Sequence, residues 1–327
     1  MSNEHKSCAT PFKTMIGGQA LIEGIMMMGP EKKAIVVRKP DGELEEKVED
    51  RVLIKDKYPI LGLPFIRGIF SFGSSMANGV KALMYSASFF PEDEEEEEEP
   101  SKFEIWLEKH LGSEKAASFF VTLAVILGMA FSVGLFILLP TALVGAGAAL
   151  AGGMPMWLRN LLEGVVRVVI FMGYLILCSR MKDIRRVFSY HGAEHKTIFC
   201  YEKGLPLTVE NVRPQSRFHP RCGTSFLFVV VIISILVFSL VSLRVGLWDN
   251  PWVRIGLRLL LLPVVVSISY EINRWVGRHD NLCSRILSAP GKWLQRLTTN
   301  EPDDSMIECA IRALELVIPE QKGSDAW

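Results

Sequence analysis

The segment AASFFVTLAVILGMAFSVGLFILL, residues 116–139, contains no charged side chain. A helix needs about 20 apolar residues to cross the hydrocarbon core of a bilayer, so this segment predicts a membrane span. Three further apolar segments of similar length follow, at residues 161–179, 225–243 and 253–270. We therefore expect an all-α polytopic membrane protein with about four transmembrane helices.

The second and fourth apolar segments carry charges near one end, and lipid disfavours charge. Glu163 and Arg167 stand four residues apart in the second segment, so they can pair across one helical turn. Arg254 and Arg258 open the fourth segment, where long side chains can reach the headgroups. Both segments are predicted spans, with a buried core helix as the alternative for each.

The composition fits a chain whose apolar and charged residues lie in separate segments. Hydrophobic residues make up 49% and charged residues 22% of the chain. Lys plus Arg and Asp plus Glu number 36 each, so net charge gives no reason to expect a nucleic-acid partner. The six cysteines form no CxxC pair, which indicates reduced thiols. Residues 1–13 lack the apolar stretch of a cleaved signal peptide.

The connections between the spans differ in positive charge. Residues 180–221 contain nine Lys or Arg, whereas residues 141–160 contain only Arg159. Because an excess of Lys and Arg marks the cytoplasmic side, we expect the middle connection and both termini in the cytoplasm. Residues 141–156 are apolar and rich in Gly and Ala, which fits either a re-entrant segment or a plain loop on the other side.

The first 90 residues predict a small α+β region that is cytoplasmic or interfacial. Residues 34–39 and 43–48 flank a Pro-Asp-Gly turn at residues 40–42, which predicts a β-hairpin. Residues 65–90 then place apolar side chains largely at helical spacing. A helix on the membrane interface and an ordinary core helix fit this pattern equally well.

The rest of the chain divides by composition. Residues 91–100 are a run of acidic residues between two prolines, which predicts a solvated linker. The membrane domain follows over residues 101–273, with a cytoplasmic connection at residues 180–224. Residues 274–327 predict a cytoplasmic helical tail, because Pro302 and two aspartates open a helix that carries one apolar stripe.

The middle connection contains the residues best suited to chemistry. His191 and His195 lie one turn apart if this part is helical, a spacing that suits two imidazoles on one metal ion. Glu194 lies beside them, where it can act as a catalytic base. The pattern H-x-x-E-H is the inverted form of a zinc-protease signature. The plain alternative is that His191 and His195 are solvated helix residues and that Glu194 pairs with Lys196 or Arg186.

A second pair of candidate ligands, His219 and Cys222, lies just before the third span. Both pairs flank one connection whose ends return to the membrane surface, so the pairs are expected to converge on a divalent metal. A thiolate favours zinc. Four protein ligands make a closed, structural site, whereas a catalytic zinc keeps a position open. An enzyme therefore needs one ligand outside the metal sphere, and Cys222 is the expected one.

Two further polar residues are weaker candidates. Glu23 follows the Gly17-Gly18 pair in an apolar stretch, and it fits either a buried acid near the metal or a half-buried strand or turn. The strand or turn, with Glu23 facing water, is favoured. His279 follows the fourth span, where it is either a further ligand or, with Trp275 nearby, a residue among the headgroups. The headgroup position is favoured.

Four blocks carry a family resemblance: GGQALIEGIMM at residues 17–27, HGAEHK at 191–196, FHPRCGT at 218–224 and EPDD at 301–304. Through them, and from about residue 15 to residue 319, the chain resembles the YqhQ family of bacterial membrane proteins. The resemblance implies a bacterial plasma-membrane protein of unknown function, predicted to be a metal-dependent enzyme. The site residues it implies are His191, Glu194, His195, His219 and Cys222.

Three functions follow as hypotheses. The first is a metal-dependent hydrolase at the cytoplasmic surface, with His191, His195, His219 and Cys222 as metal ligands and Glu194 as catalytic base. The second is a non-enzymatic accessory or assembly factor for other membrane proteins, in which the metal is structural. The third is a transporter, because Arg167 and Arg258 lie inside predicted spans that run in the same direction.

Overall fold

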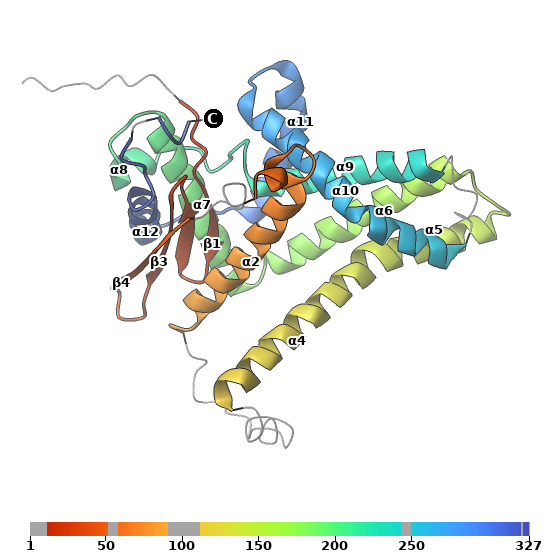
Figure 1. Ribbon diagram of the computed structural model, residues 1–327, viewed down its shortest axis with the longest axis horizontal. Helices are drawn as coiled ribbons and strands as arrows, with labels where there is room; N and C mark the ends of the chain where they lie inside the picture. Colours follow the sequence, from red (N-terminus) through yellow and green to blue (C-terminus); the bar gives the residue numbers. More distant parts are fainter. Residues whose placement is uncertain (1–11, 52–57, 91–111, 243–249, 322, 327) are drawn as a thin grey trace, which may run out of the picture. The chain divides into compact units, whose positions relative to one another are not determined.

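The computed structural model describes residues 12–51, 58–90, 112–242, 250–321 and 323–326 (Figure 1). The predicted acidic linker at residues 91–100 lies outside them. The chain divides into two compact units. Unit 1 comprises Met1–Phe90, Tyr174–Val237 and Leu260–Trp327, and unit 2 comprises Pro91–Gly173 and Phe238–Leu259. The protein is mostly helical, with one small sheet in unit 1.

The sheet is an antiparallel meander with the order β1-β2-β3-β4. Its strands are β1 (Gly17–Leu21), β2 (Gly24–Met28), β3 (Lys32–Arg38) and β4 (Leu44–Asp50). The predicted hairpin of residues 34–39 and 43–48 is confirmed as β3 and β4. A two-residue turn joins β1 to β2, and its Glu23 adopts φ +48°, a conformation in which non-glycine residues are uncommon.

Both faces of the sheet are covered by helices. Alternate residues of a strand face opposite sides, and here both sides are apolar. One face packs on α7 (Lys182–Glu202) and α12 (Asp304–Glu315) through a core that includes Ile25, Met27, Ala34, Val36, Tyr190, Ile307 and Leu314. The other face packs on α2 (Arg67–Ala87) through Leu21, Met26, Ile35, Val37 and Ala82. The sheet therefore lies between two helical layers (Figure 1).

The C-terminal helix forms as its sequence predicts. Asp303 is the N-cap of α12, and its side chain accepts a hydrogen bond of 2.9 Å from the Met306 N–H. This satisfies one of the N–H groups that a helix leaves without an internal partner. The predicted apolar stripe is buried, with Ile307 and Leu314 fully enclosed.

The predicted helix of residues 65–90 is confirmed as α2. It buries Gly68, Gly79, Ala82 and Ser86. Seven of its large apolar side chains remain exposed, namely Ile69, Phe70, Phe72, Met76, Val80, Leu83 and Met84. So much exposed apolar surface is unusual for an ordinary core helix. The remaining short or peripheral helices of unit 1 are η1 (Pro59–Gly62), α8 (Val209–Val212) and α11 (Leu282–Thr298).

Three helices in the described residues are long and apolar enough to cross a membrane: Phe119–Leu150, Met156–Cys178 and Trp252–Arg278. The first joins α4 (Ser113–Val133), a π-helical turn η3 (Gly134–Leu138) and α5 (Leu139–Leu150), the second is α6, and the third belongs to α10 (Pro251–Arg278). The predicted third span corresponds to α9 (Gly223–Ser242), whose apolar part, Phe226–Ser242, is shorter.

The plain-loop alternative for residues 141–156 is wrong for most of their length. The helix that begins at α4 continues through α5 to Leu150. Alanine is the best helix former and apolar side chains suit a lipid surround, so the Gly residues there do not end the helix. The connection to α6 is therefore only the five residues 151–155.

The charged residues of unit 2 do not form the expected i,i+4 pair of Glu163 with Arg167. Glu163 forms a salt bridge with Arg258, and both side chains are 2% exposed or less. Arg258 also donates 2.6 Å to the Thr141 hydroxyl and 3.2 Å to the Asn160 carbonyl oxygen. Arg167, the expected partner of Glu163, donates instead to the Phe136 carbonyl at 2.7 Å.

Arg254 and Arg258 were expected to reach the headgroups, and that expectation is wrong. Both side chains are almost fully buried, at 1% and 2% exposure. The reason is clear for Arg258, because Glu163 offers it a carboxylate inside unit 2. A buried charge needs such a partner, and a partner within reach removes the need to extend to water.

We expect Arg258→Met to lower the free energy of unfolding of unit 2 by about 3–5 kcal/mol, because it leaves the Glu163 carboxylate buried without its cation. The double variant with Glu163→Met is expected to recover most of this loss. The measurement is thermal unfolding in detergent. Arg285→Met is the control, since the ion pair of Arg285 with Asp280 is solvent-exposed. Equal stability of the single and double variants would contradict the pairing.

Candidate metal centre

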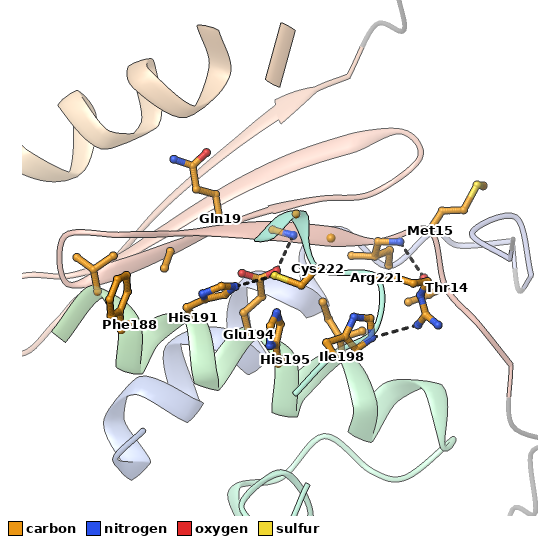
Figure 2. Close-up of a pocket in the computed structure, with 17 residues that line it drawn as sticks. Thr14, Met15, Gln19, Phe188, His191, Glu194, His195, Ile198, Arg221 and Cys222 are labelled. Carbon is orange, nitrogen blue, oxygen red and sulfur yellow. Dashed lines mark hydrogen bonds between the residues drawn. The ribbon is translucent and has the colours of Figure 1, made fainter. Parts of the chain in front are cut away.

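Helix α7 presents His191, Glu194 and His195 toward one pocket (Figure 2). The helix begins after Met181, whose backbone is extended, so it is separate from the apolar helix α6 that ends at Cys178. Its central part is buried, including Glu194 and His195 at 5% and 1% exposure. The solvated-helix alternative is therefore excluded for His195. The expected partners of Glu194 bind elsewhere, since Arg186 pairs with Glu23 and Lys196 with Glu301.

The segment that follows α11 fixes the position of α7. Asn300 donates its backbone N–H to the Phe188 carbonyl at 2.9 Å. Lys196 is buried on the same helix and pairs with Glu301 at 2.7 Å. A Cβ atom at Gly192 would lie 2.0 Å from the Asn300 carbonyl oxygen, so only glycine permits this approach. The C-terminal part of unit 1 thereby holds the helix that carries the two histidines.

We expect Gly192→Ala to destabilise unit 1 by at least about 1–3 kcal/mol, because the added methyl group meets backbone rather than a movable side chain. The measurement is the melting temperature of the purified protein in detergent. Gly73→Ala is the control, since a Cβ atom in that position of α2 has no neighbour within 4 Å. A Gly192→Ala protein as stable as this control would contradict the close approach.

Cys222 completes a group of three candidate metal ligands. The donor atoms of His191, His195 and Cys222 all lie within 4.8 Å of one another. The His191 Nε2 is 3.2 Å from the Cys222 Sγ. Cys222 precedes α9, so two segments 27 residues apart converge as the sequence predicts. Imidazole and thiolate together form a donor set that suits zinc.

Backbone carbonyls orient both imidazoles. The Nδ1–H of His191 donates to the Thr298 carbonyl at 2.9 Å, and that of His195 donates to the Arg217 carbonyl at 2.5 Å. Both rings therefore direct Nε2, the second nitrogen, toward the shared centre. Metal-binding histidines commonly use the other ring nitrogen in this way, which fixes the tautomer and ring position.

Protonation of the ligand group also fits a metal site. Burial by itself lowers the pKa of His191, but Cys222, Glu194 and the Thr298 carbonyl together outweigh burial and raise the pKa to about 9. Burial opposes ionisation of Cys222, yet the charge of His191 lowers the pKa of its thiol well below the ordinary value. The pair thus holds the thiolate that binds metals, and His191 must release its Nε2 proton when an ion binds.

Glu194 is buried beside the ligands. Its Oε1 accepts a hydrogen bond of 2.9 Å from the Gly18 N–H in β1. Its Oε2 is buried without a hydrogen-bond partner among the described residues. Burial raises the pKa of this carboxyl group. A buried carboxylate with one oxygen held and the other unbonded suits a group that accepts and returns a proton.

His219 does not belong to the ligand group. Its Nε2 faces Arg221 at 3.1 Å and Glu202 at 3.8 Å, and burial lowers its pKa to about 4. Its backbone is clamped by Gln295, which accepts its N–H at 2.7 Å and donates to its carbonyl at 2.8 Å. The ligand expected outside the metal sphere was Cys222, whereas the structure brings Cys222 in and leaves His219 outside.

Several residues that hold the site were not found by sequence analysis. Gln295 lies on α11, and Thr298 and Arg217 act through backbone carbonyls. A carbonyl leaves no trace in the sequence, so no pattern could have identified these two. Gln295 is fully buried in an amphipathic helix. Its position as a polar residue on the apolar face of that helix is the one sequence feature that could have pointed to its role.

The two weaker candidates lie away from the ligand group. Glu23 is in the β1–β2 turn, where it pairs with Arg186 and accepts from the Tyr190 hydroxyl at 3.3 Å. The favoured turn position is thus confirmed, but the expectation that Glu23 faces water is wrong, because its carboxylate pairs with Arg186. His279 stacks on Trp275 with ring centroids 4.7 Å apart and donates to the Trp275 carbonyl.

Comparisons with known proteins cover the three candidate ligands and Glu194. The model of a family described as a protein of unknown function, DUF1385, matches residues 63–320. The chain is 36% identical over 309 residues to the "Uncharacterized protein YqhQ" of Bacillus subtilis (strain 168), which covers 91% of this chain and 90% of that protein. No solved structure matches the chain.

Proposed function

The chain belongs to the DUF1385 family of unknown function, and from its metal centre we propose that it is a metal-dependent hydrolase at a membrane surface. One observation carries the proposal. Three converging ligands, His191, His195 and Cys222, lie beside a buried carboxylate, Glu194, that has one unbonded oxygen. Three protein ligands leave a coordination position open, which is the arrangement of catalytic zinc sites.

The donor set fits a divalent ion, with zinc favoured by the thiolate. When bound, such an ion supplies a Lewis acid and lowers the pKa of a water molecule beside it. The protein itself positions the ligands that would hold the ion. His191 and His195 are held by carbonyls, so their Nε2 atoms are fixed before any ion or substrate arrives.

Glu194 supplies the proton transfers of hydrolysis. Its Oε2 takes a proton from the attacking water while the new bond forms from the water oxygen to the substrate carbon. The bond to the leaving atom then breaks, and the same carboxyl group returns the proton to that atom. Burial raises the pKa of this carboxyl group, which makes it a stronger base than an exposed carboxylate.

We further propose that the site faces the cytoplasm of a bacterial cell, with the chain embedded in the plasma membrane. The support is the excess of Lys and Arg in residues 180–221 together with the three long apolar helices. α9 would supply a fourth span, which brings both termini to the same side. The exposed apolar side chains of α2 fit contact with lipid at the interface.

The test is metal analysis joined to a simple hydrolysis assay. We expect the protein, purified in mild detergent, to contain about one zinc per chain and to hydrolyse 4-nitrophenyl acetate. Removal of the metal with 1,10-phenanthroline should abolish the hydrolysis, and added zinc should restore it. A protein that purifies without stoichiometric metal, or whose esterase activity survives chelation, would overturn the proposal.

An accessory or assembly factor with a structural metal is the alternative function. The broad exposed apolar surface of α2 is the observation that favours it, because such a surface also suits a membrane-protein partner. This alternative expects a stable partner after chemical crosslinking and a cellular phenotype that does not depend on Glu194. The hydrolase expects the reverse on both counts.

A further inference from the structure

The metal centre lies in a groove between a strand and a helix. The pocket has a volume of about 400 Å³. One wall is the consecutive stretch of residues 14–20, which includes most of β1, and the other is the face of α7 that carries the ligands. Figure 2 shows the strand running along the pocket, with the side chains of His191, Glu194 and His195 beneath it.

β1 is an edge strand of the sheet. Within the described residues it pairs, as a strand, only with β2. On its other side the Ile16 N–H donates to the Thr14 hydroxyl and the Gly18 N–H to Glu194, so the open pairing position is Ala20. The Gly18 N–H donates to Glu194 and therefore points away from β2. In an antiparallel pair the backbone groups of alternate residues point the same way, so the Ala20 N–H and carbonyl also face the groove.

We propose that this groove binds its substrate as an extended polypeptide segment that adds to the free edge of β1. The proposal rests on the hydrolase function and names its substrate class. An unpaired strand edge is a template for another strand, and main-chain pairing of this kind recognises the polypeptide backbone itself. Because Gly18 binds Glu194, a segment paired at Ala20 passes directly beside the carboxylate and the ligand group.

The lining of the groove fits a peptide better than an anionic substrate. Its only Lys or Arg side chain is Arg221, which is already bound to Glu202. The groove therefore offers a phosphate ester no Lys or Arg side chain that is free to pair with it. The apolar lining residues instead suit the alternate side chains of an extended peptide, and they are Met15, Ile16, Ala20, Val187, Phe188 and Ile198.

The paired glycines at the start of β1 also have a role in this arrangement. A Cβ atom at Gly18 would lie 2.5 Å from the Met26 carbonyl oxygen and 3.1 Å from the Glu194 carboxyl carbon. Glycine thus lets the strand edge approach Glu194 closely. At Gly17 a Cβ atom has no neighbour within 4 Å, so that side of the strand is open.

The proposed reaction is hydrolysis of one peptide bond. Water adds its oxygen to the carbonyl carbon, and Glu194 accepts the proton that the water loses. The carbon–nitrogen bond breaks, and the proton passes from Glu194 to the departing nitrogen. One peptide bond and one water become a carboxyl group and an amine, which ionise in solution, and no other reactant is needed.

Proline at position 20 tests the edge pairing, because it removes the N–H that faces the groove and is tolerated on an edge strand. The probe is a library of random octapeptides, incubated with zinc-loaded full-length protein in detergent and read by mass spectrometry for new termini. We expect Ala20→Pro to slow zinc-dependent cleavage about five- to tenfold. Val48→Pro, in the exposed edge strand β4 on the opposite side of the sheet, is the control and should cleave at the wild-type rate.

A binding measurement accompanies cleavage. With Glu194→Gln to prevent turnover, p-benzoylphenylalanine in place of exposed Met15 should crosslink a biotinylated octapeptide library. The same library with alternate N-methylated residues should not crosslink, because it cannot form the ladder. The crosslinker in place of Val48, exposed on the opposite edge strand β4, is the control and should give only background.

The outcomes separate this proposal from the hydrolase function. Zinc-dependent hydrolysis of 4-nitrophenyl acetate without peptide cleavage or crosslinking would overturn the peptide assignment and leave the hydrolase standing. Loss of the esterase activity as well would overturn both. Cleavage by Ala20→Pro at the wild-type rate, with normal zinc content, would overturn the pairing with β1, as would equal crosslinking from Val48.

Discussion

Replacing Glu194 by glutamine is expected to leave zinc bound and to lower the hydrolysis rate by about 10²–10⁴-fold, the usual contribution of a general base. The amide has nearly the same shape, and its oxygen can still accept the hydrogen bond from the Gly18 N–H. It cannot take up a proton at the position of Oε2. The structure of the site should therefore survive while its proton transfer is lost.

Two measurements check this prediction on the same protein preparation. Zinc content should match the wild type, and the rate constant for 4-nitrophenyl acetate should fall. Glu210→Gln, an exposed carboxylate on α8, is the control and should leave both unchanged. A Glu194→Gln protein that retains full activity would show that this carboxylate is not the base. A protein that loses its zinc would show that the residue is a ligand instead.

Cys222→Ser should abolish stoichiometric zinc binding. Loss of a group that merely orients a ligand typically costs 10–100-fold in metal affinity, so loss of a ligand itself should cost more than about 100-fold. A serine hydroxyl does not ionise beside His191 as the thiol does, and it is a poorer ligand for zinc. Hydrolysis should disappear together with the metal.

The affinity is measured by competition with a chromophoric chelator after extraction in mild detergent. Cys283→Ser provides the matched control, because this cysteine is exposed on α11 and is not part of the ligand group. The control should bind zinc as the wild type does. Retention of one tightly bound zinc by Cys222→Ser would show that the thiol is not a ligand, and His219 would again be the candidate for the third ligand.

The local parts of the centre could be predicted from sequence, because helical spacing alone brings His191 and His195 to one face. Cys222 could be expected nearby, since both ends of its connection return to the same surface. What could not be predicted was that His219 turns away. That outcome depends on Glu202 and Arg221 forming a separate polar group next to it, which no spacing rule reveals.

The same limit applies to the fold. The β3–β4 hairpin and α12 follow from turn chemistry and helix capping, which act over a few residues. Glu163 was expected to pair four residues away, yet its partner Arg258 is on another helix. The i,i+4 rule describes pairs within an isolated helix. A buried carboxylate is stabilised by any cation that tertiary packing brings close to it, including one on another helix.

The carbonyl groups that hold the two imidazoles have a consequence for how this centre tolerates variation. They belong to the peptide chain at Thr298 and Arg217, so any amino acid that preserves the local path offers the same oxygen. The side chains at both positions can therefore be substituted without changing the orientation of the His191 and His195 rings. A comparison of side chains alone would therefore identify the candidate metal ligands but miss the backbone carbonyls that orient the two imidazoles.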